Sequence, residues 1–149
     1  MEGYKQWAQS FSMEWLNELL NSIEKNCSQE NCALLLEGCG ACHYKSMEHM
    51  LEKYVGDLQG FINFMVKKHG QIITYDEAKN IILVDENKSY CVCPINQCMN
   101  GKKVSPALCH CSASMTQKMI SKITGKEVKS RVVTSVLRGD KSCVYEIKL

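Results

Sequence analysis

The residues of this chain best suited to chemistry are its cysteines, ten in 149 residues. Most of them fall into three close groups: Cys39 and Cys42; Cys91, Cys93 and Cys98; and Cys109 and Cys111. Clustered thiols serve as metal ligands, redox pairs or disulfide partners. The N-terminal sequence lacks the basic start and apolar stretch of a secretion signal, which predicts a cytoplasmic protein. Metal binding or catalysis is then favoured over the alternative, five disulfides in a secreted protein.

The spacing within each group allows a metal site. A two-residue spacer lets Cys39 and Cys42 reach one metal, and Gly40 suits the turn expected between them. Cys91 and Cys93 would share one face of a strand that ends at Pro94. We predict that the three segments meet and share a zinc ion, an iron–sulfur cluster or a soft ligand. The predicted ligands are Cys39, Cys42, Cys91, Cys93, Cys109 and Cys111, with Cys98, His43 and His110 in reserve.

A thiol enzyme is the alternative interpretation of the same residues. Cys109 and Cys111 immediately precede a helix expected to start at 112–114, where the helix dipole would lower a thiol pKa. Cys111 would then be the nucleophile, and His110 or His43 the base, for a small carbon–sulfur or carbon–nitrogen substrate. The periodicity places Cys143 in the core, and leaves Cys27 and Cys32 undecided. A methionine-rich core would also accommodate an apolar small-molecule ligand.

The periodicity along the chain predicts one α+β domain over residues 1–149. Residues 1–70 form a helical part, which includes an apolar stripe from Tyr4 to Ile23 and a short helical run ended by Gly38 and Gly40. Residues 71–149 form an antiparallel sheet of about four to five strands, on which the helical half packs. One of these strands is expected over 89–93. One long helix, beginning near Ser114 and ending at Gly125, is inserted before the C-terminal hairpin.

Charge and hydropathy narrow the partners that the chain is expected to bind. The chain is net acidic over residues 1–99 and net basic over residues 100–149. Nucleic-acid binding is not expected, because no recognition motif accompanies the basic residues. No apolar run approaches the ~20 residues of a membrane span. The expected partner is therefore a metal or a small soft or apolar ligand.

The second half of the chain resembles a known family. The relevant motifs are Cys91-x-Cys93-Pro94, Leu108 to Ser112, and the ending Gly139-Asp140-x-x-Cys143-x-x-x-Ile147. They are similar to the small-molecule-binding 4-vinyl reductase domain and to its cysteine-rich bacterial relatives, including proteins like L-2-amino-thiazoline-4-carboxylic acid hydrolase. The resemblance implies an α+β ligand-binding fold of the type shared with vesicle-tethering subunits, and a homodimer.

Overall fold

The structure is a computed structural model that describes residues 1–99 and 101–149. Within these ranges the helices are α1 (Glu2–Asn26), α2 (Gln29–Leu51), α3 (Leu58–His69), α4 (Pro94–Cys98) and α5 (Leu108–Thr124), with two short 3-10 turns, η1 (Glu52–Tyr54) and η2 (Val136–Arg138). The strands are β1 (Ile72–Asp76), β2 (Ile81–Asp85), β3 (Lys129–Thr134) and β4 (Val144–Lys148). The predicted α+β class, with helices mostly in the N-terminal half, is confirmed.

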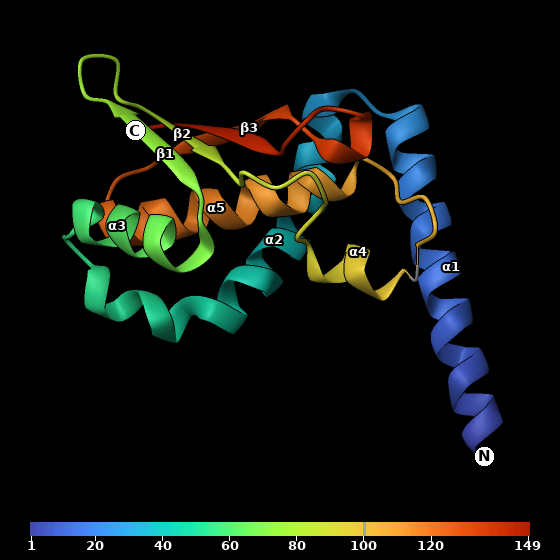
Figure 1. The fold of residues 1–149 in the computed structure, drawn as a ribbon. Helices are drawn as coiled ribbons and strands as arrows, with labels where there is room; N and C mark the ends of the chain where they lie inside the picture. The colour runs from blue at the N-terminus through green and yellow to red at the C-terminus, as the bar shows by residue number, and fades with distance from the viewer. Residues whose placement is uncertain (100) are drawn as a thin grey trace.

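The described strands form a single four-stranded antiparallel sheet in the order β1-β2-β4-β3. The helix α5 runs between β2 and β3 in sequence and lies against one face of the sheet, with α3 beside it (Figure 1). Side chains alternate accordingly: Ile82 and Val84 are buried, whereas Leu83 between them is exposed. The inserted helix before the C-terminal hairpin is thus present as predicted.

The main core lies between this sheet and the helices. Met119, Ile120 and Ile123 recur at helical spacing on α5 and pack with Ile82 and Ile147 of the sheet. Helix boundaries follow the expected local signals. Asp57 caps α3 by accepting a hydrogen bond from the Gly60 N–H at 2.8 Å, and Gly125 ends α5 in the left-handed conformation at φ 67°.

The predicted break at Gly38 and Gly40 is wrong, because α2 continues through both glycines to Leu51. Gly40 is buried where α2 crosses α5. A Cβ atom at Gly40 would overlap the Ser114 side chain and lie 2.9 Å from the Cys111 carbonyl oxygen. The glycine therefore permits close helix packing, and Cys39 and Cys42 lie one turn apart on a helix instead of flanking a turn.

Two other expected boundaries are also wrong. Residues 89–93 do not form the predicted strand: residues 89 and 90 bend, residues 91–93 are irregular, and Pro94 begins the short helix α4 immediately after them. The long helix starts at Leu108, six residues before Ser114. Pro106 and the hydroxyl of Ser105, which accepts the Ala107 N–H at 3.2 Å, precede this earlier start. Cys109 and Cys111 therefore lie inside the first turn and a half of α5.

The predicted apolar stripe on α1 forms a helix, but most of it faces outward. Leu20 is buried, whereas Tyr4, Trp7, Phe11 and Trp15 are more than half exposed. Figure 1 shows the N-terminal half of α1 extending away from the rest of the fold. No helix in the described part of the chain is long and apolar enough to cross a membrane. The homodimer expected from the family resemblance stays a prediction.

Candidate functional site

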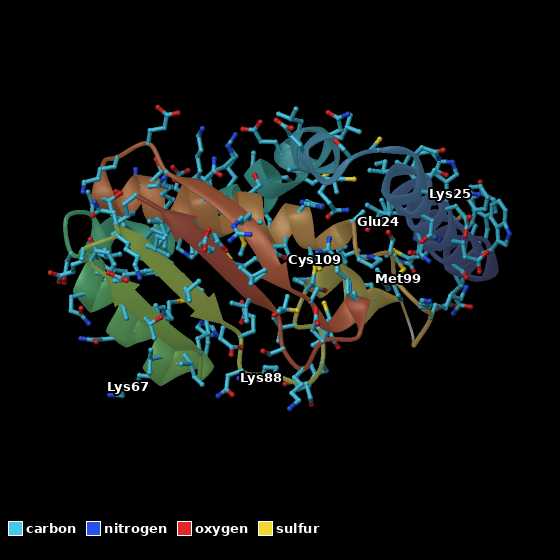
Figure 2. The ribbon with its side chains drawn as sticks, turned by 90° about the horizontal axis from the view of Figure 1, so that it is seen from above. Glu24, Lys25, Lys67, Lys88, Met99 and Cys109 are labelled. Carbon is cyan, nitrogen blue, oxygen red and sulfur yellow. The ribbon has the colours of Figure 1, made fainter. Side chains whose placement is uncertain are left out.

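Four buried cysteines line one cavity of about 300 Å³, which we call the thiol pocket. They are Cys91 and Cys93 before α4, Cys109 on α5, and Cys143 before β4. Each is less than a tenth exposed. Figure 2 shows sulfur atoms gathered around Cys109, close to the end of the sheet. Segments far apart in sequence thus bring their thiols to one place.

In the segment 91–93, which precedes α4, two cysteine side chains point into the protein. Cys91 and Cys93 are buried while Val92 between them is exposed, as the alternation of an extended chain requires. The Gln97 side chain returns from α4 and donates a hydrogen bond to the Cys91 carbonyl oxygen at 2.7 Å. The Gln97 N–H donates to the Cys93 carbonyl at 3.1 Å. The predicted shared face is present, although no strand forms.

The other two thiols are coupled through hydrogen bonds. Cys109 Sγ lies 3.0 Å from Ser135 Oγ, and the Val136 N–H donates to Cys143 Sγ at 3.5 Å. The Cys109 thiol also acts as a donor to Cys143, which lowers the pKa of Cys143 below that of an ordinary thiol. The same hydrogen bond and burial raise the pKa of Cys109. The expected lowering at the helix start is therefore wrong for Cys109, and the thiolate is favoured at Cys143 instead.

The remaining predicted ligands lie near the edge of this group. Burial raises the pKa of Cys111 to about 12, and nearby Cys93, Cys39 and Cys42 contribute in the same direction. Cys39 and Cys42 are exposed on α2, and Cys98 is exposed on α4. The three predicted segments therefore come together. Among the described residues, however, no three of these sulfur atoms lie within 4.8 Å of one another.

The rest of the thiol pocket is mostly soft or neutral. Its wall includes the thioethers of Met47, Met65 and Met115, and the imidazole of His43, whose pKa is lowered by burial. The three methionines also line a smaller neighbouring cavity of about 50 Å³, whose other walls include aliphatic side chains of β1, β2 and α5. A space walled by the three methionines, and also by Gln71, Glu86 and Thr116, thus continues from the thiols toward the core.

His110 does not face the thiol pocket. It lies on another side of α5, where its Nε2 atom is 3.1 Å from Gln29 Oε1. One ligand atom each from Glu24, Cys32 and His110 lie within 4.8 Å of one another. His110, a predicted reserve ligand, is thus close to other ligand-type side chains, but the predicted cysteines are not among them.

Sequence reasoning missed Glu24 and the role of Cys143. Cys143 is buried as its periodicity predicts, but its sulfur also forms part of the thiol pocket. Cys143 accepts hydrogen bonds from residues 109 and 136, and no motif in the sequence predicts these contacts. Glu24 carries no motif at all. The one sequence signal near this group is the position of Cys32, beside the break between α1 and α2.

Comparison with known proteins shows a likeness of fold. No protein-family model matches the chain, and a search of curated proteins finds no match. One similar solved structure is a trafficking protein particle complex subunit 3 from Naegleria fowleri, covalently bound to palmitic acid. It is 8% identical to this chain, with a TM-score of 0.53 over 97% of this chain and 96% of its own. The two proteins share an overall fold.

Proposed function

We propose that the protein binds a soft metal ion in the thiol pocket. The observation that carries the proposal is that four buried thiols from three distant segments line the same cavity. Thiolate and thioether sulfurs favour soft ions such as monovalent copper, as well as zinc and iron–sulfur clusters. Three methionine thioethers beside the four thiols shift the preference toward the softest of these ions.

The thiols of the pocket differ in pKa, and we expect a metal to bind by replacing their protons. Cys143 is the thiol best able to start binding, because its pKa is lowered by hydrogen bonds from Cys109 and the Val136 N–H. Burial holds the pKa of Cys91 at about 11, so this thiol binds a metal only by losing its proton. Affinity therefore rises with pH.

The thiol-enzyme alternative is less well supported in the form predicted from sequence. Burial raises the pKa of Cys111 to about 12, so the thiol is protonated at neutral pH and a poor nucleophile. The Nε2 atom of His110 contacts Gln29. The environment of the Cys111 thiol therefore favours the protonated form and does not activate it as a nucleophile.

Anaerobic metal binding tests the proposal. Protein purified under reducing conditions is assayed by elemental analysis and free-thiol counting, and then titrated with monovalent copper against a chromogenic copper chelator. We expect wild type to retain copper in competition with the chelator, and the Cys93→Ser/Cys109→Ser variant to lose most of that retention. Cys27→Ser, outside the pocket, is the matched control. Equal retention by the pocket variant and wild type would refute the proposal.

A covalently held acyl chain is a second candidate, favoured by the largely apolar cavity that continues from the thiols. The structural neighbour is described as covalently bound to palmitic acid. In this chain, a pocket thiol would attack the carbonyl of an activated acyl donor such as an acyl thioester, form a new thioester with the acyl chain and release the donor's thiol. Intact-mass spectrometry before and after hydroxylamine treatment tests this, because hydroxylamine cleaves thioesters. A mass equal to that of the unmodified chain in both samples would exclude it.

A further inference from the structure

A second set of ligand-type side chains lies outside the thiol pocket. It consists of Glu24 near the end of α1, Cys32 on the first turn of α2 and His110 on α5. Figure 2 shows Glu24 where α1 meets the body of the protein. The cluster joins the consecutive helices α1 and α2 to α5, which lies much later in the chain, so it forms only in the folded chain.

Two of these three groups are poorly satisfied by the protein alone. The Oε2 atom of Glu24 is buried without a hydrogen-bond partner, which is costly for a carboxylate. Cys32 is fully buried, and its sulfur has only long contacts with the carbonyl oxygens of Ile23 at 3.7 Å and Cys27 at 3.9 Å. The third group, His110, is also buried. A cation between them would supply the partner that the carboxylate lacks.

We propose that Glu24, Cys32 and His110 form a binding site for a divalent transition metal, with zinc as the preferred ion. Carboxylate, thiolate and imidazole are the three ligand types that zinc uses in proteins. With bond lengths of about 2.0 to 2.3 Å, donor atoms on a zinc tetrahedron are roughly 3.3 to 3.6 Å apart. The three donors already lie within 4.8 Å of one another, so small side-chain rotations suffice.

The surroundings hold the imidazole in the form that binds a metal, whereas the thiol must lose its proton to bind. Burial and the positive charge of Arg138 lower the pKa of His110, which keeps the imidazole neutral and able to bind a metal. Burial and the negative charge of Glu24 raise the pKa of Cys32, so metal binding there releases a proton. Gln29 orients the site, because its Nε2 donates to Glu24 at 3.3 Å and its Oε1 accepts from Arg138 at 2.5 Å.

Three protein ligands leave a fourth position, which is the pattern of an exchangeable or catalytic zinc rather than a closed structural one. His110, Gln29 and Arg138 also line a cleft of about 530 Å³ on this side of α5. We assign the fourth position to water or a small anion that enters from this cleft and meets the Arg138 guanidinium. The site thus differs in ligand type from the sulfur-rich thiol pocket.

Spectroscopy with Co²⁺ as a probe for zinc tests the proposal. The starting protein is a Cys93→Ser/Cys109→Ser/Cys143→Ser variant that keeps native circular dichroism, so that binding at the thiol pocket is removed. We expect one Co²⁺ per chain, tetrahedral ligand-field bands and a charge-transfer band from a single sulfur. Adding Cys32→Ser should remove the charge-transfer band, and adding Glu24→Gln should weaken Co²⁺ binding at least tenfold. Cys98→Ser, an exposed cysteine on α4, is the control and should change neither.

Two results would overturn the inference. One is an unchanged charge-transfer band after Cys32→Ser, and the other is unchanged Co²⁺ affinity after Glu24→Gln, a substitution that keeps the size of the side chain. X-ray absorption of the zinc-loaded wild type at one equivalent gives an independent test, because a site with one sulfur and several nitrogen or oxygen neighbours differs from a sulfur-rich one. The Arg138→Gln variant should reduce the response of the Co²⁺ spectrum to added phosphate, and an unchanged response would refute the assignment of the fourth position.

Discussion

Replacement of Gly40 by alanine tests whether close contact between α2 and α5 organises the cysteines. The added Cβ would overlap the Ser114 side chain, including its Cβ, and would lie 2.9 Å from the Cys111 carbonyl oxygen. Non-bonded carbon atoms prefer separations of about 3.5 to 4.0 Å, so the two helices must move apart by roughly 1 Å. Rotation of the Ser114 hydroxyl cannot relieve this overlap, because the Cβ is fixed to the α5 backbone.

Two opposing effects set the size of the change. Overpacking of this kind costs about 1 to 3 kcal/mol, whereas a helical glycine replaced by alanine gains about 1 kcal/mol in helix propensity. The contact involves fixed atoms of the partner helix, which places the cost toward the upper end. We therefore expect Gly40→Ala to lower the free energy of unfolding by about 1 to 2 kcal/mol, or the melting temperature by about 3 to 6 °C.

Gly38→Ala is the matched control, because Gly38 lies on the same helix and an added Cβ there meets nothing within 4 Å. This variant should keep the propensity gain and become more stable by about 0.5 to 1 kcal/mol. Urea unfolding followed by circular dichroism measures both variants under reducing conditions. If Gly40→Ala were as stable as Gly38→Ala, the crossing would be looser than described, and the argument that it brings Cys39 and Cys42 near Cys111 would fail.

Three further predictions concern protonation and capping. The Cys109→Ala variant removes the thiol donor to Cys143, so the earliest step in an ultraviolet thiolate titration should move to higher pH; no movement would show that Cys109 is not the donor. The pKa of Cys91 is raised from 9.0 to about 11, so the folded state holds this proton longer than the unfolded chain does. This contribution to stability is complete below pH 9.0 and is lost as pH rises through about 11; urea unfolding at a series of pH values should show a shallower alkaline decline for Cys91→Ala. Loss of the cap in Asp57→Ala should cost about 1 kcal/mol by the same unfolding assay, and a cost near zero would mean that the bond to the Gly60 N–H contributes little.

Local signals in the sequence predicted those parts of the fold that depend on local interactions. The stop at Gly125 depends on the backbone conformation of one residue and appears as predicted. The Asp57 cap is likewise a hydrogen bond within a few residues of the chain. The predicted helix end at Gly40 is wrong, because a glycine that permits a turn and a glycine that permits a close helix crossing cannot be distinguished in the sequence. Only the position of α5 distinguishes the two uses.

The candidate site depended on contacts that sequence cannot specify. The expected α+β arrangement predicts that the segment ending at Pro94 and the start of the long helix meet at one edge of the sheet, near Cys39 and Cys42. These segments lie close together in the structure. The protonation pattern was not predictable in the same way. Whether Cys109 or Cys143 carries the thiolate depends on hydrogen bonds from Ser135 and Val136, which reach these cysteines through the packing of η2 against α5.

The position of β4 has a consequence for the order in which the protein folds. It follows β3 in the chain yet lies between β2 and β3, so the sheet stays incomplete until this strand is inserted. Its pairing with β2 joins segments about sixty residues apart, as between Val84 and Tyr145, and such non-local contacts form slowly. Cys143 directly precedes β4, so the thiol pocket closes at the same step. Until then the cysteines of the chain are open to oxidation, and a premature disulfide among them would block the insertion that buries them.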